Sequence, residues 1–153
     1  MPVHKMFLHV RLQAMTPTRD VDLASRWREL LARYHTLSCA LDRALQEEHG
    51  IGMSDFEALD LLIDADHEKL RMQDLAAGMY LSQSALSRTI ARLESRGLVT
   101  RAMCADDRRA VFVAPTDSGR ALHAQARPTH RAVLADCLDR PEDAPRPDGP
   151  QCG

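Results

Sequence analysis

The stretch SQSALSRTIARLESRG, residues 82–97, constrains the fold more than any other part of the chain. Its apolar residues repeat at the spacing of one face of an α-helix: Leu86, Ile90 and Leu93. Ser82 and Gly97 are residue types that commonly begin and end helices. The opposite face carries small polar residues and arginines but no lysine. The stretch therefore predicts a helix with one buried side and one side suited to close contact with another molecule.

The segments on either side of this helix complete a recognisable supersecondary pattern. Residues 72–79 predict a short helix followed by a turn, so that the two helices form a helix-turn-helix. After Gly97 the period changes, and residues 98–102 and 110–114 are β-prone runs joined by a charged loop. Thr116 can cap a helix after this hairpin. The sequence predicts a mainly α-helical fold with a small β-hairpin wing, a winged helix-turn-helix with long additional helices.

The long additional helices flank this unit. Residues 22–49 predict one helix, whose apolar residues are spaced close to a heptad: Leu23, Trp27, Leu30, Tyr34, Leu37, Leu41 and Leu45. Such a stripe can pack on the rest of the domain, on a second copy of the chain, or on both. Ser54 and Glu57 match a capping box and predict a shorter second helix. Residues 117–139 predict a last helix, with a bend at Pro128.

The chain of 153 residues is long enough for one domain with its own core. We expect an extension over residues 1–20, a long helix over 21–50, the winged helix-turn-helix over 51–116, a helix over 117–139 and a disordered proline-rich acidic tail over 140–153. No stretch approaches the roughly 18 apolar residues of a membrane-spanning helix. The four cysteines are widely spaced and form no CxxC pair, which argues against a disulfide framework and indicates a cytoplasmic protein.

Charge is segregated along the chain, although the formal net charge is only −2. Residues 82–109 carry a net charge of +3, and every cation among them is arginine, whereas residues 136–148 carry −3. A cluster of arginines on a helix and the following hairpin is typical of a nucleic-acid interface.

On the predicted recognition helix, the residues that face away from the apolar side include Gln83, Ser84, Ser87, Arg88 and Arg92. Arg88 could bind guanine O6 and N7 together, Gln83 suits adenine, and the serines suit a base or a phosphate. At the tip of the hairpin, Arg108 and Arg109 could enter a minor groove. Asp107, two residues before Arg109, could pair with Arg109 and hold its side chain extended.

Residues 75–101, LAAGMYLSQSALSRTIARLESRGLVTR, and residues 106–122, DDRRAVFVAPTDSGRAL, resemble the MarR family of bacterial winged-helix transcription factors. The resemblance covers roughly residues 27–138. Its most specific pieces are the helix exit RLESRGLV, the wing tip DRR and the helix entry T-x-x-G. It implies a homodimer on a pseudo-palindromic operator in double-stranded DNA, with residues 84–92 in the recognition helix and Asp107 and Arg109 as the wing pair.

The resemblance also implies how binding would be regulated. Most members repress transcription and release DNA when they bind a small, often aromatic, anionic ligand or when a cysteine is oxidised. Trp27, Tyr34 and Phe56 could line a ligand cleft, although tryptophan and phenylalanine at positions like Trp27 and Phe56 are more often core residues. Cys39 is the candidate for oxidation because His35 and Arg43 lie four residues away from it. A buried structural thiol is the favoured interpretation of Cys39.

One region departs from the family pattern. Residues 140–153 stand where such proteins usually have a further helix that intertwines with the partner. The dimer interface would then rest on the stripe from Trp27 to Leu45, on the N-terminal extension and on the helix around residues 121–138.

Other classes of function are disfavoured. His123, His130 and Cys137 are spaced by sevens, but Pro128 interrupts the helix and no fourth ligand is evident, so we expect neither metal nor cofactor. We expect no enzymatic activity, because no nucleophile–base pair and no glycine-rich phosphate loop is present. A winged helix used only for protein interaction is the alternative of another class, and the arginine-rich face argues against it.

Overall fold

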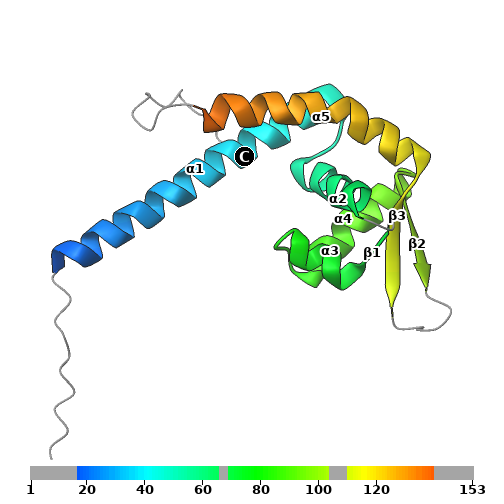
Figure 1. Cartoon of the computed structure of the whole chain (residues 1–153), viewed down its shortest axis with the longest axis horizontal. Helices are drawn as coiled ribbons and strands as arrows, with labels where there is room; N and C mark the ends of the chain where they lie inside the picture. The colour runs from blue at the N-terminus through cyan, green and yellow to red at the C-terminus, as the bar shows by residue number, and fades with distance from the viewer. Residues whose placement is uncertain (1–16, 66–68, 104–109, 140–153) are drawn as a thin grey trace, which may run out of the picture. The chain divides into compact units, whose positions relative to one another are not determined.

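The computed structural model describes residues 17–65, 69–103 and 110–139, so the predicted wing tip, the predicted tail and most of the predicted extension lie outside it. The described residues form five helices and three strands (Figure 1): α1 (Pro17–His49), α2 (Met53–Asp64), β1 (Leu70–Arg71), α3 (Met72–Gly78), α4 (Gln83–Ser95), β2 (Val99–Met103), β3 (Val111–Pro115) and α5 (Asp117–Leu138). This confirms the predicted mainly α-helical winged helix-turn-helix. None of the described helices is both long and apolar enough to cross a membrane.

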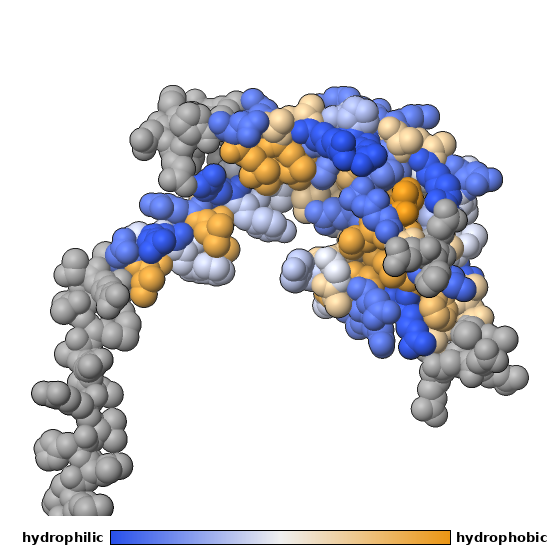
Figure 2. Space-filling view, viewed as in Figure 1, coloured by the Kyte–Doolittle hydropathy of each residue, from blue (hydrophilic) through white to orange (hydrophobic). Residues whose placement is uncertain are grey.

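The chain divides into two units, Met1–Tyr34 and His35–Gly153, and α1 contributes residues to both. In the first unit, the apolar stripe of α1 is exposed to solvent (Figure 2). Its residues Leu23, Trp27, Leu30 and Tyr34, together with the neighbouring Leu31, have exposed fractions between 45% and 63%. In the second unit, Leu41 and Leu45 of the same stripe are buried. Only the second half of the heptad pattern therefore contributes side chains to the core.

The main core of the second unit joins α2, α3, α4 and the sheet. Its buried residues are Ala58, Leu59, Leu62, Leu75, Ala76, Met79, Leu86, Ile90, Leu93, Leu98, Val99 and Val113. Leu86, Ile90 and Leu93 have no exposed surface, as the helical period of α4 predicted. Burial of these three side chains fixes which side of α4 faces outward.

The predicted hairpin is present as β2 and β3, with Val99 opposite Pro115 and Met103 opposite Val111. The sheet also contains β1, which pairs with the other edge of β3 and gives the antiparallel order β1-β3-β2. The pattern of the sequence does not predict β1, because two residues are too few to show the alternation of a strand.

Two of the predicted helix starts are confirmed. The Ser82 hydroxyl accepts a hydrogen bond from the Ala85 amide at 3.2 Å, and the Thr116 hydroxyl accepts one from the Gly119 amide at 3.1 Å. Gly97 adopts a φ of +70°, a left-handed conformation that suits glycine after the end of α4.

The predicted capping box of Ser54 and Glu57 is wrong, because α2 begins at Met53 and both residues lie inside the helix. Gly52 is the N-cap, and its amide donates to Asp55 Oδ2 at 3.3 Å. The Met53 amide donates to Asp42 Oδ1 of α1 at 2.9 Å. Carboxylates from α1 and from α2 thus satisfy the first amides of α2, so no serine cap is needed.

Candidate nucleic-acid interface

The outward face of α4 includes Gln83, Ser84, Ser87, Arg88 and Arg92, all of which are exposed. They lie on the side opposite the buried residues Leu86, Ile90 and Leu93, as the sequence predicted. Short serine side chains beside longer glutamine and arginine side chains leave room for a base edge to approach the helix.

Arg92 differs from the rest of this face because its guanidinium is bound to a carboxylate of α2. Arg92 Nε donates to Asp55 Oδ1 and Oδ2 at 3.0 and 3.1 Å, and Nη2 donates to Oδ1 at 2.6 Å. The Asp55 side chain is 3% exposed, whereas that of Arg92 is 49% exposed. These hydrogen bonds raise the pKa of Arg92 above its usual value because they stabilise the charged form.

Two more arginines at the end of α4 and in β2 also have partners within the chain. Arg96 Nη1 donates to the carbonyl oxygen of Gly50 at 2.8 Å, and Arg101 Nε lies 3.2 Å from Glu94 Oε2. Within the part of the chain that the structure describes, Arg88 makes no hydrogen bond or ion pair. Arg88 is therefore the arginine of the outward face whose donors are available to a ligand.

A groove of about 640 Å³ lies beside the outward face of α4. We call it the arginine groove, and its lining residues are Arg71, Met72, Gln73, Gln83, Ser87, Arg101, Ala110 and Val111. The groove brings Gln83 and Ser87 together with Arg71 and Arg101. Gln83 and Ser87 were predicted to bind DNA, whereas Arg71 and Arg101 were not. Periodicity could not reveal this proximity, because Arg71 belongs to the two-residue strand β1.

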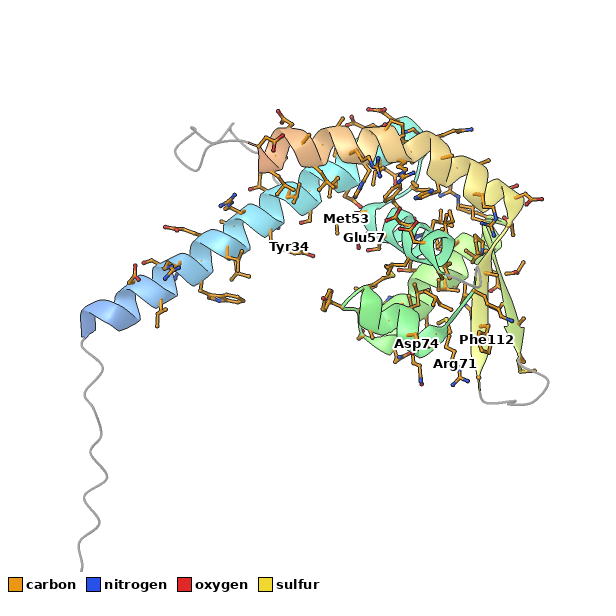
Figure 3. The ribbon with its side chains drawn as sticks, in the orientation of Figure 1. Tyr34, Met53, Glu57, Arg71, Asp74 and Phe112 are labelled. Carbon is orange, nitrogen blue, oxygen red and sulfur yellow. The ribbon has the colours of Figure 1, made fainter. Side chains whose placement is uncertain are left out.

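Two cationic side chains at this edge of the sheet make cation–π contacts with one aromatic ring. Arg71 Cζ lies 5.5 Å and Lys69 Nζ 5.3 Å from the centroid of the Phe112 ring, and Figure 3 shows Arg71 close to Phe112. Such cation–π contacts hold the two charges in place without neutralising them. The tip of the wing, with the predicted DNA contacts Asp107, Arg108 and Arg109, lies outside the described residues.

The predicted ligand residues do not share one environment. Phe56 is 1% exposed and stacks on His123 and His130, with ring centroids 5.0 and 4.3 Å away, so it belongs to the core. Trp27 and Tyr34 belong to the first unit and are 58% and 63% exposed. The interpretation of Phe56 as a core residue therefore agrees with its burial. The same interpretation of Trp27 does not agree with its exposure.

One of the two histidines around Phe56 makes a polar contact with α2. His123 Nε2 lies 2.6 Å from Asp60 Oδ1. Burial lowers the pKa of His130 because it disfavours the charged ring. The pKa of Glu57 is raised mainly by burial and to a smaller extent by the nearby negative charge of Asp60. Within the described ranges, no group of three or more histidine, cysteine or acidic residues could hold a metal ion.

The lowered pKa of His130 predicts a pH dependence of stability. The folded state disfavours the protonated ring of His130, so the neutral ring contributes to the stability of the fold. This contribution to stability is fully present above the unfolded pKa of about 6.5 and is lost as the pH falls through the lower folded pKa. We expect the free energy of unfolding of the wild type, relative to His130→Gln, to fall as the pH is lowered from about 7 through and below the unfolded pKa of about 6.5. Urea unfolding of both proteins across this range measures the difference, and a constant difference would contradict the expectation.

Cys39 is disulfide-bonded in the structure, so it is not the unpaired structural thiol that was one of its two interpretations. Its Sγ lies 3.8 Å from His35 Nε2. Of the described cysteines, Cys137 is free and partly buried. The wide spacing of the cysteines did not indicate this disulfide, because spacing along the chain does not show which cysteines can pair.

Known proteins resemble this chain across the elements just described. The family model that matches residues 49–110 is described as the MarR family. AbsC, a MarR family transcriptional regulator from Streptomyces coelicolor, is 34% identical, with a TM-score of 0.70 and coverage of 78% of this chain and 82% of AbsC. Sco3205, a MarR family transcriptional regulator from the same organism solved in complex with DNA, is 30% identical, with a TM-score of 0.73 and coverage of 80% and 77%.

A third solved structure, CouR from Rhodococcus jostii RHA1 bound to p-coumaroyl-CoA, is 29% identical, with a TM-score of 0.64 and coverage of 74% of this chain and 79% of CouR. The chain spans less than half the length, 46% and 42%, of the two curated Bacillus subtilis transcriptional regulators that it matches. The chain covers more than two thirds of AbsC at 34% identity, and its fold is that of a winged helix. This chain belongs to the MarR family of transcriptional regulators.

Proposed function

We propose that this protein is a homodimeric repressor that binds a pseudo-palindromic DNA operator and releases it when a small aromatic or anionic molecule binds. The observation that carries the proposal is the outward face of α4, where Arg88 has no partner within the described part of the chain and the arginine groove adjoins. The DNA-bound structure of Sco3205, which is 30% identical to this chain, supports it.

In this proposal α4 enters the major groove of the operator. Arg88 and Gln83 contact base edges, because their side chains present the donors and acceptors that guanine and adenine match. Arg71 and Arg101 line the adjacent groove, where they would contact the phosphate backbone. The tip of the wing, with Arg108 and Arg109, would enter the flanking minor groove.

The exposed half of the α1 stripe supports the homodimer. Five large apolar side chains that are 45% to 63% exposed along one helix form more apolar surface than scattered single residues do. A second copy can cover this stripe with its own, as in a two-fold symmetric interface. Two recognition helices related by a two-fold axis would then match a pseudo-palindromic site.

Salt-dependent binding to the DNA adjacent to its own gene tests the proposal. We expect a footprint with two half-sites about one helical turn apart, and affinity that falls steeply between about 50 and 200 mM salt because phosphate contacts release counterions. Arg71→Ala and Arg101→Ala should each reduce the salt slope by about one. Arg127→Ala removes an exposed arginine of α5 outside the arginine groove and is the matched control.

Absence of a footprint, or binding that does not weaken with salt, would contradict DNA binding and favour a winged helix used for protein interaction. Sedimentation of the free protein reports the dimer independently.

The signal that relieves binding is proposed to be a small aromatic or anionic molecule, since CouR, 29% identical, was solved with p-coumaroyl-CoA bound. Oxidation of Cys39 is the second candidate, favoured by the disulfide at this residue. Operator binding measured with and without a reductant, in the wild type and in Cys39→Ser, separates the two signals.

A further inference from the structure

The last turn of α4 is attached to the turn that connects α1 with α2. Arg96 donates to the carbonyl oxygen of Gly50 at 2.8 Å, and Arg92 holds Asp55 with three hydrogen bonds. The same Asp55 carboxylate accepts from the Gly52 amide at 3.3 Å. Arg96, the C-cap residue of α4, thus binds the first residue of the three-residue turn 50–52 directly, whereas Arg92 reaches the last residue of that turn through Asp55.

The turn is also held from α1. Asp42 Oδ1 accepts from the Met53 amide at 2.9 Å. A Cβ at Gly52 would lie 2.9 Å from that same oxygen, so any other residue there would displace the Asp42 carboxylate. Gly50 has a φ of +65°, which also favours glycine. The turn therefore has little freedom to move relative to Asp42 on one side and to α4 on the other.

Asp55 cannot easily exchange Arg92 for water. Its side chain is 3% exposed, and breaking the pair would leave a buried carboxylate without its charge partner. A buried ion pair of this kind adds little net stability, but it fixes geometry because both donors of the planar guanidinium must meet one carboxylate. Rotation of α4 about its axis would break this arrangement.

Resting on the proposed DNA binding, we propose that Arg92 and Arg96 are positioning residues that orient the outward face of α4 through the α1–α2 turn, rather than residues that contact DNA. Arg88 and Arg92 are four residues apart and project from neighbouring positions of one helix face, so the sequence cannot distinguish their roles. Their partners do distinguish them, because Arg92 is bound to Asp55 and Arg88 has no partner among the described residues.

Arg92→Lys separates positioning from contact, because lysine keeps the charge but cannot reproduce the two-pronged contact with Asp55. If Arg92 positions α4, operator affinity falls by about tenfold while the salt slope stays at the wild-type value. If Arg92 contacts a phosphate, lysine substitutes for it and affinity stays within about twofold, which would overturn the proposal. Thermal unfolding of the variant confirms that it is folded at the temperature of the assay.

A double-mutant cycle tests whether Arg92 acts through Asp55. We expect Arg92→Gln to weaken operator binding in the wild type but to change it less than about twofold in Asp55→Asn, since the interaction is already lost there. Arg127→Ala, the matched control outside the outward face, should leave operator binding unchanged in both backgrounds. An effect of Arg92→Gln that is equal in both backgrounds would overturn the proposal.

Hydrogen exchange of the free protein examines the attachment without DNA. Arg92→Lys should speed exchange of the Gly52 and Met53 amides, whose acceptors are Asp55 and Asp42, by about tenfold, while amides of β3 keep their rates. Unchanged exchange at the turn would overturn the inference even if the wild type binds DNA as proposed. Absence of any operator binding by the wild type, with faster exchange at the turn, would instead refute the proposed function alone.

Discussion

Gly119→Ala is expected to destabilise the protein by about 3 kcal/mol, at the upper end of the cost of forcing an extra methyl group into a packed site. A Cβ at Gly119 would lie 2.1 Å from the backbone oxygen of Leu98 and 3.3 Å from Leu59 Cδ2. The Leu98 oxygen cannot move away freely, because it accepts a hydrogen bond from the Thr116 amide at 3.0 Å. The methyl group must therefore push α5 away from the start of β2, and urea unfolding measures the cost.

Gly78→Ala is the matched control, because Gly78 also lies in a helix. There the nearest atom to an added Cβ is the flexible Leu61 Cδ1 at 3.2 Å, and alanine gains about 1 kcal/mol of helix propensity. We expect the free energy of unfolding of this variant to differ from that of the wild type by less than about 1 kcal/mol. Equal urea midpoints for Gly119→Ala and the wild type would contradict the close approach of α5 to Leu98.

The same contact explains what the sequence pattern T-x-x-G could and could not indicate. Thr116 was predicted as a helix cap from residue type alone, and the cap is confirmed. The pattern gives no reason for its glycine, because that reason lies in Leu98, a residue 21 positions earlier that only the fold brings near.

The helices were predictable because each buries a face with a helical period that is visible in the chain. Leu86, Ile90 and Leu93 share one face of α4, and all three are in the core. Pairwise polar contacts leave no such period, so the bond between Arg92 and Asp55 was not predictable, and neither was the contact of Arg71 with Phe112. Consequently the sequence predicted which residues of α4 face outward, but it did not predict which of the arginines on this face bind a partner within the chain.

Arg88→Ala is expected to relax operator specificity at one or two base pairs, by about 1–3 kcal/mol of discrimination at each. The reason is that Arg88 presents paired donors without a competing partner in the described part of the chain, so guanine O6 and N7 can accept them together. Competition with operators that carry single base-pair substitutions measures this loss, and Arg127→Ala is the control. Retained discrimination at every position would contradict base contact by Arg88.

Arg109→Ala is expected to act differently, although the same charge is removed. An arginine of the wing that enters a minor groove senses mainly groove width and charge, so its loss should weaken binding to all of these operators by a similar factor. The ratio of affinities for matched and substituted operators should therefore fall for Arg88→Ala and stay constant for Arg109→Ala. If both variants keep wild-type operator affinity, α4 and the wing do not dock on DNA as proposed, whatever the oligomeric state of the protein.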